Sequence, residues 1–249
     1  MIIRKNNEEL EKMRVVGRIT ARVCEKVKES IFPGITTAKI NEIAESWIEH
    51  FGAKSAFKGY RGYPATVCIS INEQVVHGIP GSRQIQPGDI VSIDLGAIYD
   101  GFYGDMAVTI MIGVTDPDII RLVETTKEAL QAGIDKALPG NRLSDISHAI
   151  ERTTQEAGFS VVRQFVGHGI GRQLHEDPQI PNFGPPGTGP KLKAGMVFAI
   201  EPMVNMGCSE VQVLQDGWTT ITNDRKPSAH FENTIVVKRG APEVLTRID

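Results

Sequence analysis

Apolar residues recur every three or four positions near the start of the chain. Between residues 7 and 30, a set of apolar side chains would share one face of a helix: Leu10, Met13, Val16, Ile19, Val23 and Val27. A Pro-Gly turn at residues 33–34 separates this segment from a second helical stretch, which stops at Gly52. The pattern predicts two successive helices at the beginning of the fold.

The same order of features returns later in the sequence. The stretch FPGITTAKINEIAESWIEHFG, residues 32–52, is echoed by LPGNRLSDISHAIERTTQEAG, residues 138–158, with the Pro-Gly turn and the final glycine in register. Two further phrases repeat in the same order: HGIP (at His77) as HGIG (at His168), and PGDIVSID (ending at Asp94) as AGMVFAIE (ending at Glu201).

These matches predict an internal duplication. Each copy would supply two helices and then strands, which gives an α+β architecture with two pseudo-symmetric halves that share a central sheet. We expect a single catalytic domain over residues 1–249, with halves at about 1–112 and 113–249.

One strongly apolar stretch contains carboxylates where a buried strand should have none. The run VSIDLGAIYDGFYGDMAVTI includes Asp94 and Asp105 among β-branched and apolar residues. Its Asp100-Gly101 pair predicts a two-residue type I′ hairpin turn. Pairing through that turn would make the two acids diagonal neighbours on one face of the sheet, about 7–8 Å apart. A three-residue loop would instead place them on opposite faces.

Glu201 and Glu232 also lie among apolar residues, and no Lys or Arg lies beside these four acids in the predicted strands. Any one of them could face water or pair with a distant arginine. Four ionised carboxylates with a neutral His168 carry a charge of about −4, which two divalent cations would cancel. Oxygen ligands with a single imidazole suit Mn, Fe, Co or Zn, and a metal pair can activate water for hydrolysis. We therefore predict a dinuclear metallohydrolase.

Composition excludes several other classes. The 249 residues are 41% hydrophobic and 23% charged, with a formal net charge of -3 and a pI near 6.1, which argues against a general nucleic-acid or membrane-surface binder. Three distant cysteines, Cys24, Cys68 and Cys208, form no CxxC pair, as expected for a reducing cytoplasm. We expect a cytoplasmic protein, because no signal-peptide core and no apolar run of about 18 residues is found.

The five expected ligands and two further histidines lie within recognisable phrases: GYPATVCISINEQVVHGIP, IDLG followed by GD at residues 104–105, GHGIGRQLHEDPQIPNFG, AIEPM and FENTIVV. In these phrases the chain closely resembles the bacterial type I methionine aminopeptidases, over essentially its whole length. The resemblance implies the pita-bread fold, with two pseudo-symmetric halves around a central antiparallel sheet. It also implies two divalent ions, with Co, Mn, Fe, Zn and Ni as candidates. Asp94 and Asp105 would hold one ion and also contact the second. The remaining ligands of the second ion would be His168, Glu201 and Glu232.

The resemblance also implies roles for other residues. Glu201 would accept the proton of the attacking water, His175 would hydrogen-bond the substrate carbonyl, and His77 would contact the peptide nitrogen beyond the scissile bond. The methionine pocket would be formed by Tyr60, Tyr63, Cys68, Leu174 and Trp218, where Leu174 replaces the aromatic residue found in the family. Without the resemblance, Cys68 and Trp218 would be ordinary core residues, and we assign His50, His148 and His230 to the surface.

The function implied is removal of the initiator methionine from nascent polypeptides whose second residue is small. The enzyme would act as a monomer near the ribosomal exit, with no specificity for nucleic acid. Two alternatives stay open: an X-Pro aminopeptidase or prolidase of the same fold, which typically has an additional N-terminal domain, and a non-catalytic peptide-binding relative, which should have lost ligands. The stretch GPPGTGPKLK, from Gly184, lacks the lysine and hydroxyl positions of a phosphate-binding loop, and we expect a surface loop that rims the site.

Overall fold

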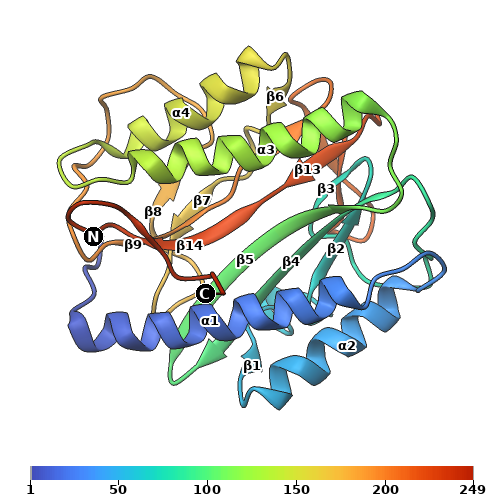
Figure 1. Cartoon of the computed structure of the whole chain (residues 1–249), viewed down its shortest axis with the longest axis horizontal. Helices are drawn as coiled ribbons and strands as arrows, with labels where there is room; N and C mark the ends of the chain where they lie inside the picture. Colours follow the sequence, from blue (N-terminus) through green and yellow to red (C-terminus); the bar gives the residue numbers. More distant parts are fainter. Residues whose placement is uncertain (1, 249) are drawn as a thin grey trace.

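A nine-stranded sheet runs through the centre of the molecule (Figure 1). The computed structural model describes residues 2–248. Along its main path, the sheet consists of β1 (Lys54–Ser55), β4 (Ile90–Tyr99), β5 (Phe102–Met111), β14 (Glu232–Val236), β9 (Val197–Ile200), β7 (Gly167–Gly169) and β8 (Glu176–Ile180). Two further strands join it at the side: β2 (Cys68–Ile71) pairs with β4, and β15 (Glu243–Val244) pairs with β14. Neighbouring strands are antiparallel throughout.

Two small three-stranded sheets accompany the central one. The first consists of β13 (Ser228–His230), β10 (Met203–Asn205) and β6 (Ser160–Val161). The second consists of β11 (Val211–Val213), β12 (Thr220–Thr222) and β3 (Gln74–Val76). A short 3-10 turn, η1, spans Tyr60–Gly62.

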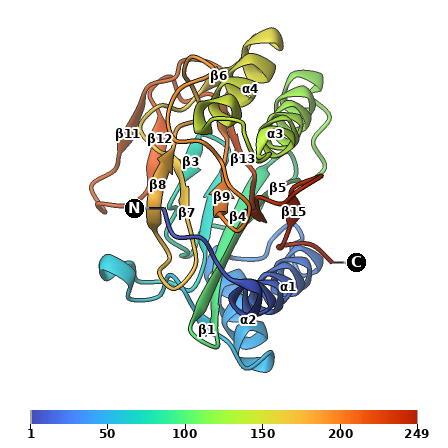
Figure 2. The ribbon, with the colours of Figure 1, turned by 90° about the vertical axis from the view of Figure 1, so that its left-hand side faces the viewer.

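Two pairs of helices pack against the central sheet, one pair beside each half (Figures 1 and 2). The first pair is α1 (Asn7–Glu29) and α2 (Thr37–His50), and the second is α3 (Pro117–Lys136) and α4 (Leu143–Glu156). A capping box stabilises the start of α1: the Asn6 side chain accepts a hydrogen bond from the Glu9 N–H, and the Glu9 carboxylate accepts one from the Asn6 N–H. The predicted helices are confirmed, including the glycine stops, where Gly52 and Gly158 have φ of 70° and 80°.

Each helix pair covers its own hydrophobic core. One core gathers residues of α1, α2, β2 and β4 around Phe102, and the other gathers residues of α3, α4, β9 and β14 around Phe198. Both phenylalanine side chains are fully buried. The α+β architecture with two similar halves around an antiparallel sheet is thus confirmed, while the duplication limits near residue 112 stay a prediction.

Among the described residues, we find no helix with the length and apolar character needed to cross a membrane.

One repeat seen in the sequence is not a repeat in the structure. His168 lies within β7 of the central sheet, where it pairs with Ala199 of β9. His77 instead follows β3 of a small sheet and has a φ of 61°. The HGIP and HGIG phrases therefore occupy different kinds of position, and their use as matching landmarks was wrong.

The predicted hairpin has the expected register. Asp100 and Gly101 have φ of 49° and 77°, as a type I′ turn requires, and they connect β4 to β5. In the paired strands, Gly96 lies opposite Asp105 and Asp94 lies opposite Ala107. Both acids therefore point to the same face of the sheet.

Candidate metal centre

A cavity of about 370 Å³ lies over the middle of the central sheet. Every residue that the sequence predicted for the site lies on its wall: Tyr60, Tyr63, Cys68, His77, Asp94, Asp105, His168, Leu174, His175, Glu201, Trp218 and Glu232. These residues come from many separate segments of the chain, so only the assembled fold creates the cavity.

Three carboxylates converge because three adjacent strands present them on one face. Asp94 of β4 and Glu232 of β14 both lie opposite Ala107 of the intervening strand β5. Asp105 lies two residues before Ala107 and so points to the same face as Ala107. Asp105 and Glu232 are only 4% and 3% exposed.

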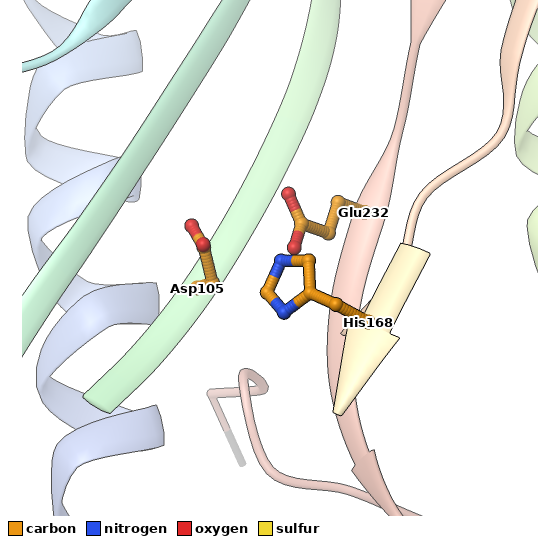
Figure 3. Close-up of side chains that lie close together, drawn as sticks. All are labelled: Asp105, His168 and Glu232. Carbon is orange, nitrogen blue, oxygen red and sulfur yellow. The ribbon is translucent and has the colours of Figure 1, made fainter. Parts of the chain in front are cut away.

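His168 and Glu201 complete this group from the other half of the sheet. His168 Nε2 lies 3.4 Å from Glu201 Oε1. The other ring nitrogen, Nδ1, donates a hydrogen bond to the Gly169 carbonyl at 2.9 Å, which leaves the lone pair of Nε2 directed at the carboxylates. Figure 3 shows Asp105, His168 and Glu232 pointing toward one another from three strands. The ligand atoms of these three residues all lie within 4.8 Å of one another.

Several polar atoms here have no partner. Within residues 2–248, the buried atoms without a hydrogen bond include Asp94 Oδ1, Asp105 Oδ1, Glu232 Oε1 and His230 Nε2. No lysine or arginine of the described chain forms an ion pair with these carboxylates. Because each unpaired buried group costs about 1–3 kcal/mol, such a concentration of free acceptors fits a site for divalent cations.

Burial strongly perturbs the protonation of the acids. It raises the pKa of Asp94 to about 7, and it raises the pKa of Glu232 well above the usual range, with further contributions from neighbouring carboxylates. The pKa values of Asp105 and Glu201 are raised for the same reasons. Burial also lowers the pKa of His168 to about 3, so this imidazole is neutral. Cations that displace the protons would remove the repulsion among the carboxylates.

His230 belongs to the site, although the sequence analysis assigned it to the surface. This side chain is 2% exposed and lines the cavity, and its Nε2 lies 4.0 Å from Glu201 Oε2. The sequence contained a signal, because His230 precedes Glu232 by two residues, and such residues share a face in extended chain. His50 is exposed and His148 is partly exposed, in line with the surface assignment.

His175 lies at one side of the carboxylates. The Tyr60 hydroxyl is 2.7 Å from His175 Nδ1, and the two rings stack with centroids 5.2 Å apart. The His175 ring also lies 4.3 Å from the His168 ring, measured between centroids. A tyrosine O–H that donates to Nδ1 fixes the imidazole proton on Nε2, where it can donate to another group.

His77 lies beside aromatic residues at another side of the cavity. Its ring makes edge contacts with Phe165 and Trp218, at centroid distances of 5.3 and 6.2 Å. Burial lowers the pKa of His77 to about 4, so this side chain is also neutral at pH 7.

The remaining wall of the cavity is largely apolar. Tyr63, Cys68 and Leu174 are each less than 5% exposed. The Tyr63 hydroxyl lies 3.0 Å from the Gly78 carbonyl, and its ring meets Trp218 edge to face at 5.1 Å. Sequence reasoning did not identify Phe57, Val76, Phe165 and Met203, which also line the cavity and whose only signal was their apolar character.

The loop that begins at Gly184 is on the surface but does not rim the cavity, so that part of the prediction was wrong. It packs instead against the start of α4. Gly187 N–H donates to Asp145 Oδ1 at 2.8 Å, and Thr188 N–H donates to Ser144 Oγ at 2.7 Å.

Comparison with known proteins agrees with this geometry. The sequence profile of metallopeptidase family M24 matches residues 11–239. This chain belongs to that family. The methionine aminopeptidase of Clostridium perfringens is 52% identical over 248 residues, and the match covers 100% of both chains. This chain also superimposes on the crystal structure of the methionine aminopeptidase from Thermotoga maritima with a TM-score of 0.98, at 46% identity and with 100% of each chain covered.

A second group of M24 structures shares the fold. The prolidase of Pyrococcus furiosus has a TM-score of 0.81 and 24% identity, and the match covers 99% of this chain but 66% of that chain. At this identity the likeness concerns the fold alone. Together these structures confirm the pita-bread fold that the resemblance implied.

Proposed function

We propose that this protein is a methionine aminopeptidase, which removes the N-terminal methionine from new polypeptides whose second residue is small. The observation that carries the proposal is the group of unpartnered buried carboxylates in a cavity that also has an apolar wall. The 52% identity to a methionine aminopeptidase over the whole chain supports the choice of substrate.

The proposed ligands are Asp94, Asp105, His168, Glu201 and Glu232, which would hold two divalent ions. Bound there, the ions would lower the pKa of a water molecule and polarise the scissile carbonyl group. The identity of the ions depends on cellular supply, because metal affinity alone selects poorly among Mn, Fe, Co, Ni and Zn.

The side chains around the ligands have distinct proposed roles. Glu201 would accept the proton of the attacking water, because its Oε1 lies 3.4 Å from Nε2 of the proposed ligand His168 and its carboxylate therefore faces the proposed ion site. His175, held by Tyr60, donates a hydrogen bond to the substrate carbonyl oxygen as negative charge develops there. His77 contacts the peptide nitrogen beyond the scissile bond.

The methionine side chain would lie against the apolar wall formed by Tyr60, Tyr63, Cys68, Leu174 and Trp218. Leu174, in place of an aromatic residue, keeps this wall apolar, and a flexible thioether packs well against such a surface. We further propose that the enzyme acts in the cytoplasm as a monomer, on nascent chains near the ribosomal exit.

A peptide assay tests the proposal. The purified protein, loaded with Mn or Co, should release methionine from Met-Ala-Ser, much less from Met-Leu-Ser, and should leave Ala-Pro peptides intact. Chelation and an Asp105→Asn variant, which removes one ligand charge, serve as controls and should abolish release. Cleavage of the Ala-Pro peptide would favour a prolidase, and absence of any product would favour a non-catalytic peptide-binding protein.

A further inference from the structure

His230 is a second imidazole that faces the carboxylates, and the fold holds its backbone firmly. The residue ends β13 and pairs with Met203 of β10. The Thr109 hydroxyl of β5 donates to the His230 carbonyl at 2.8 Å and accepts the His230 N–H at 2.9 Å. The Ser92 hydroxyl of β4 lies 2.8 Å from the same Thr109 hydroxyl. Contacts among β4, β5 and β13 therefore fix the position of the His230 backbone, from which the side chain extends into the cavity.

The Nε2 atom of this imidazole has no partner among the described residues, and the side chain is 2% exposed. A buried ring nitrogen without a hydrogen bond is unfavourable, so its position calls for a ligand. Nε2 is directed at a group of carboxylates that also have unpaired oxygens, Glu232 Oε1 among them.

The distances suit coordination better than hydrogen bonding. His230 Nε2 lies 4.0 Å from Glu201 Oε2, which is beyond hydrogen-bond range. Two ligand atoms bonded to one ion at about 2.0–2.2 Å can lie up to about 4.4 Å apart. The ligand atoms of Glu201, His230 and Glu232 all lie within 4.8 Å of one another, so small side-chain movements would bring them onto one ion.

We propose that His230 Nε2 is a ligand of a divalent ion, which it shares with Glu201 and Glu232. The centre would then contain two coordinating imidazoles, His168 and His230, where the resemblance implied one. Glu201 suits this arrangement, because one of its oxygens lies 3.4 Å from His168 Nε2 and the other faces His230. A second imidazole would favour Co, Ni or Zn over Mn, which prefers oxygen ligands. The inference rests on the proposed function only in requiring that divalent ions bind among these carboxylates.

Proton NMR of the Co(II)-loaded protein in water tests the proposal directly. Each coordinating imidazole contributes an exchangeable N–H signal that the paramagnetic ion shifts far outside the normal range. We expect two such signals in the wild-type protein. One should disappear in His230→Gln and the other in His168→Gln, while His50→Gln, which changes an exposed histidine, should lose neither.

Binding constants provide a second measurement. The His230→Gln variant should lose affinity for Co(II) by a larger factor than for Mn(II), because the lost nitrogen matters less to an ion that prefers oxygen. Equal losses for the two ions would contradict coordination by His230.

The outcomes separate this inference from the proposed function. A single shifted signal in the wild-type protein, unchanged in His230→Gln, would overturn coordination by His230 even if methionine release is intact. Two signals without methionine release would support the ligand and refute the peptidase. Absence of any Co(II) uptake would refute both.

Discussion

A buried ion pair connects the start of the chain to the segment that carries His175, and its removal should be costly. Lys5 Nζ lies 2.5 Å from Glu176 Oε2, and the two side chains are 3% and 5% exposed. Glu176 directly follows His175 at the beginning of β8, and its other oxygen accepts the Arg172 N–H at 2.8 Å. Lys5 is itself held by a 2.7 Å hydrogen bond from its N–H to the Gly195 carbonyl.

The Lys5→Met substitution would leave the Glu176 carboxylate buried without its cation. Removing one partner of a buried pair costs about 3–5 kcal/mol, and the remaining hydrogen bonds from the backbone N–H groups of Arg172 and Gln173 place this case near the lower value. For a protein of this length, a loss of about 3 kcal/mol corresponds to a fall of about 6–12 °C in the unfolding midpoint. Replacing both residues, as Lys5→Met with Glu176→Gln, should return stability to within about 1 kcal/mol of the wild type, because no buried charge remains.

Urea denaturation of the wild type, Lys5→Met, the double variant and one control, at equal metal loading, measures these differences in the free energy of unfolding. The matched control is Lys39→Met, which breaks a pair of similar length, 2.8 Å to Glu42, whose side chains are 60% and 63% exposed. This control should change stability by less than about 1 kcal/mol. A Lys5→Met variant as stable as the control, or a double variant as unstable as Lys5→Met alone, would contradict a buried ion pair whose two charges depend on each other.

Four further predictions concern the site itself. His175→Ala should keep the fold and the metal content but lower kcat by about 10²–10³, as expected for removal of one preorganised donor, and wild-type turnover in a steady-state peptide assay would exclude that role. Burial raises the pKa of Asp94 from 3.8 to about 7. Between about pH 4 and pH 7, the folded metal-free protein therefore binds more protons than the unfolded chain, and its free energy of unfolding should fall as the pH rises through this range. Added Mn(II), which requires the deprotonated acid, should raise the unfolding midpoint more at pH 8 than at pH 6, and thermal scans in which the increment shrinks with pH would contradict this. Gly169→Ala would place a Cβ 2.1 Å from the Asp177 carbonyl oxygen and would push β7 away from β8. The free energy of unfolding, measured by urea titration, should fall by about 1–3 kcal/mol, and metal affinity, measured by calorimetry, should also fall.

The sequence alone determined the features that depend on near neighbours. Helical spacing, the Pro-Gly turns and the glycine stops predicted the helices, because a helix is stabilised by residues three and four positions apart. The Asp100-Gly101 turn predicted the register of β4 and β5, and with it the common face of Asp94 and Asp105, because a two-residue turn fixes each pair along the hairpin. The five ligand positions were proposed from unpaired charge in apolar segments and from the resemblance.

Only the tertiary structure decided which distant residues meet. The meeting of Asp94 with Glu232 depends on the pairing of β5 with β14, a contact between segments more than a hundred residues apart, which no local preference selects. The same long-range packing buried His230 beside Glu201 and held the loop after Gly184 against α4, away from the cavity. It also showed that the phrases at His77 and His168 are not equivalent. Side-chain burial is a property of the whole assembled chain, so the sequence supplied the candidate ligands, and the sheet order decided which of them lie together.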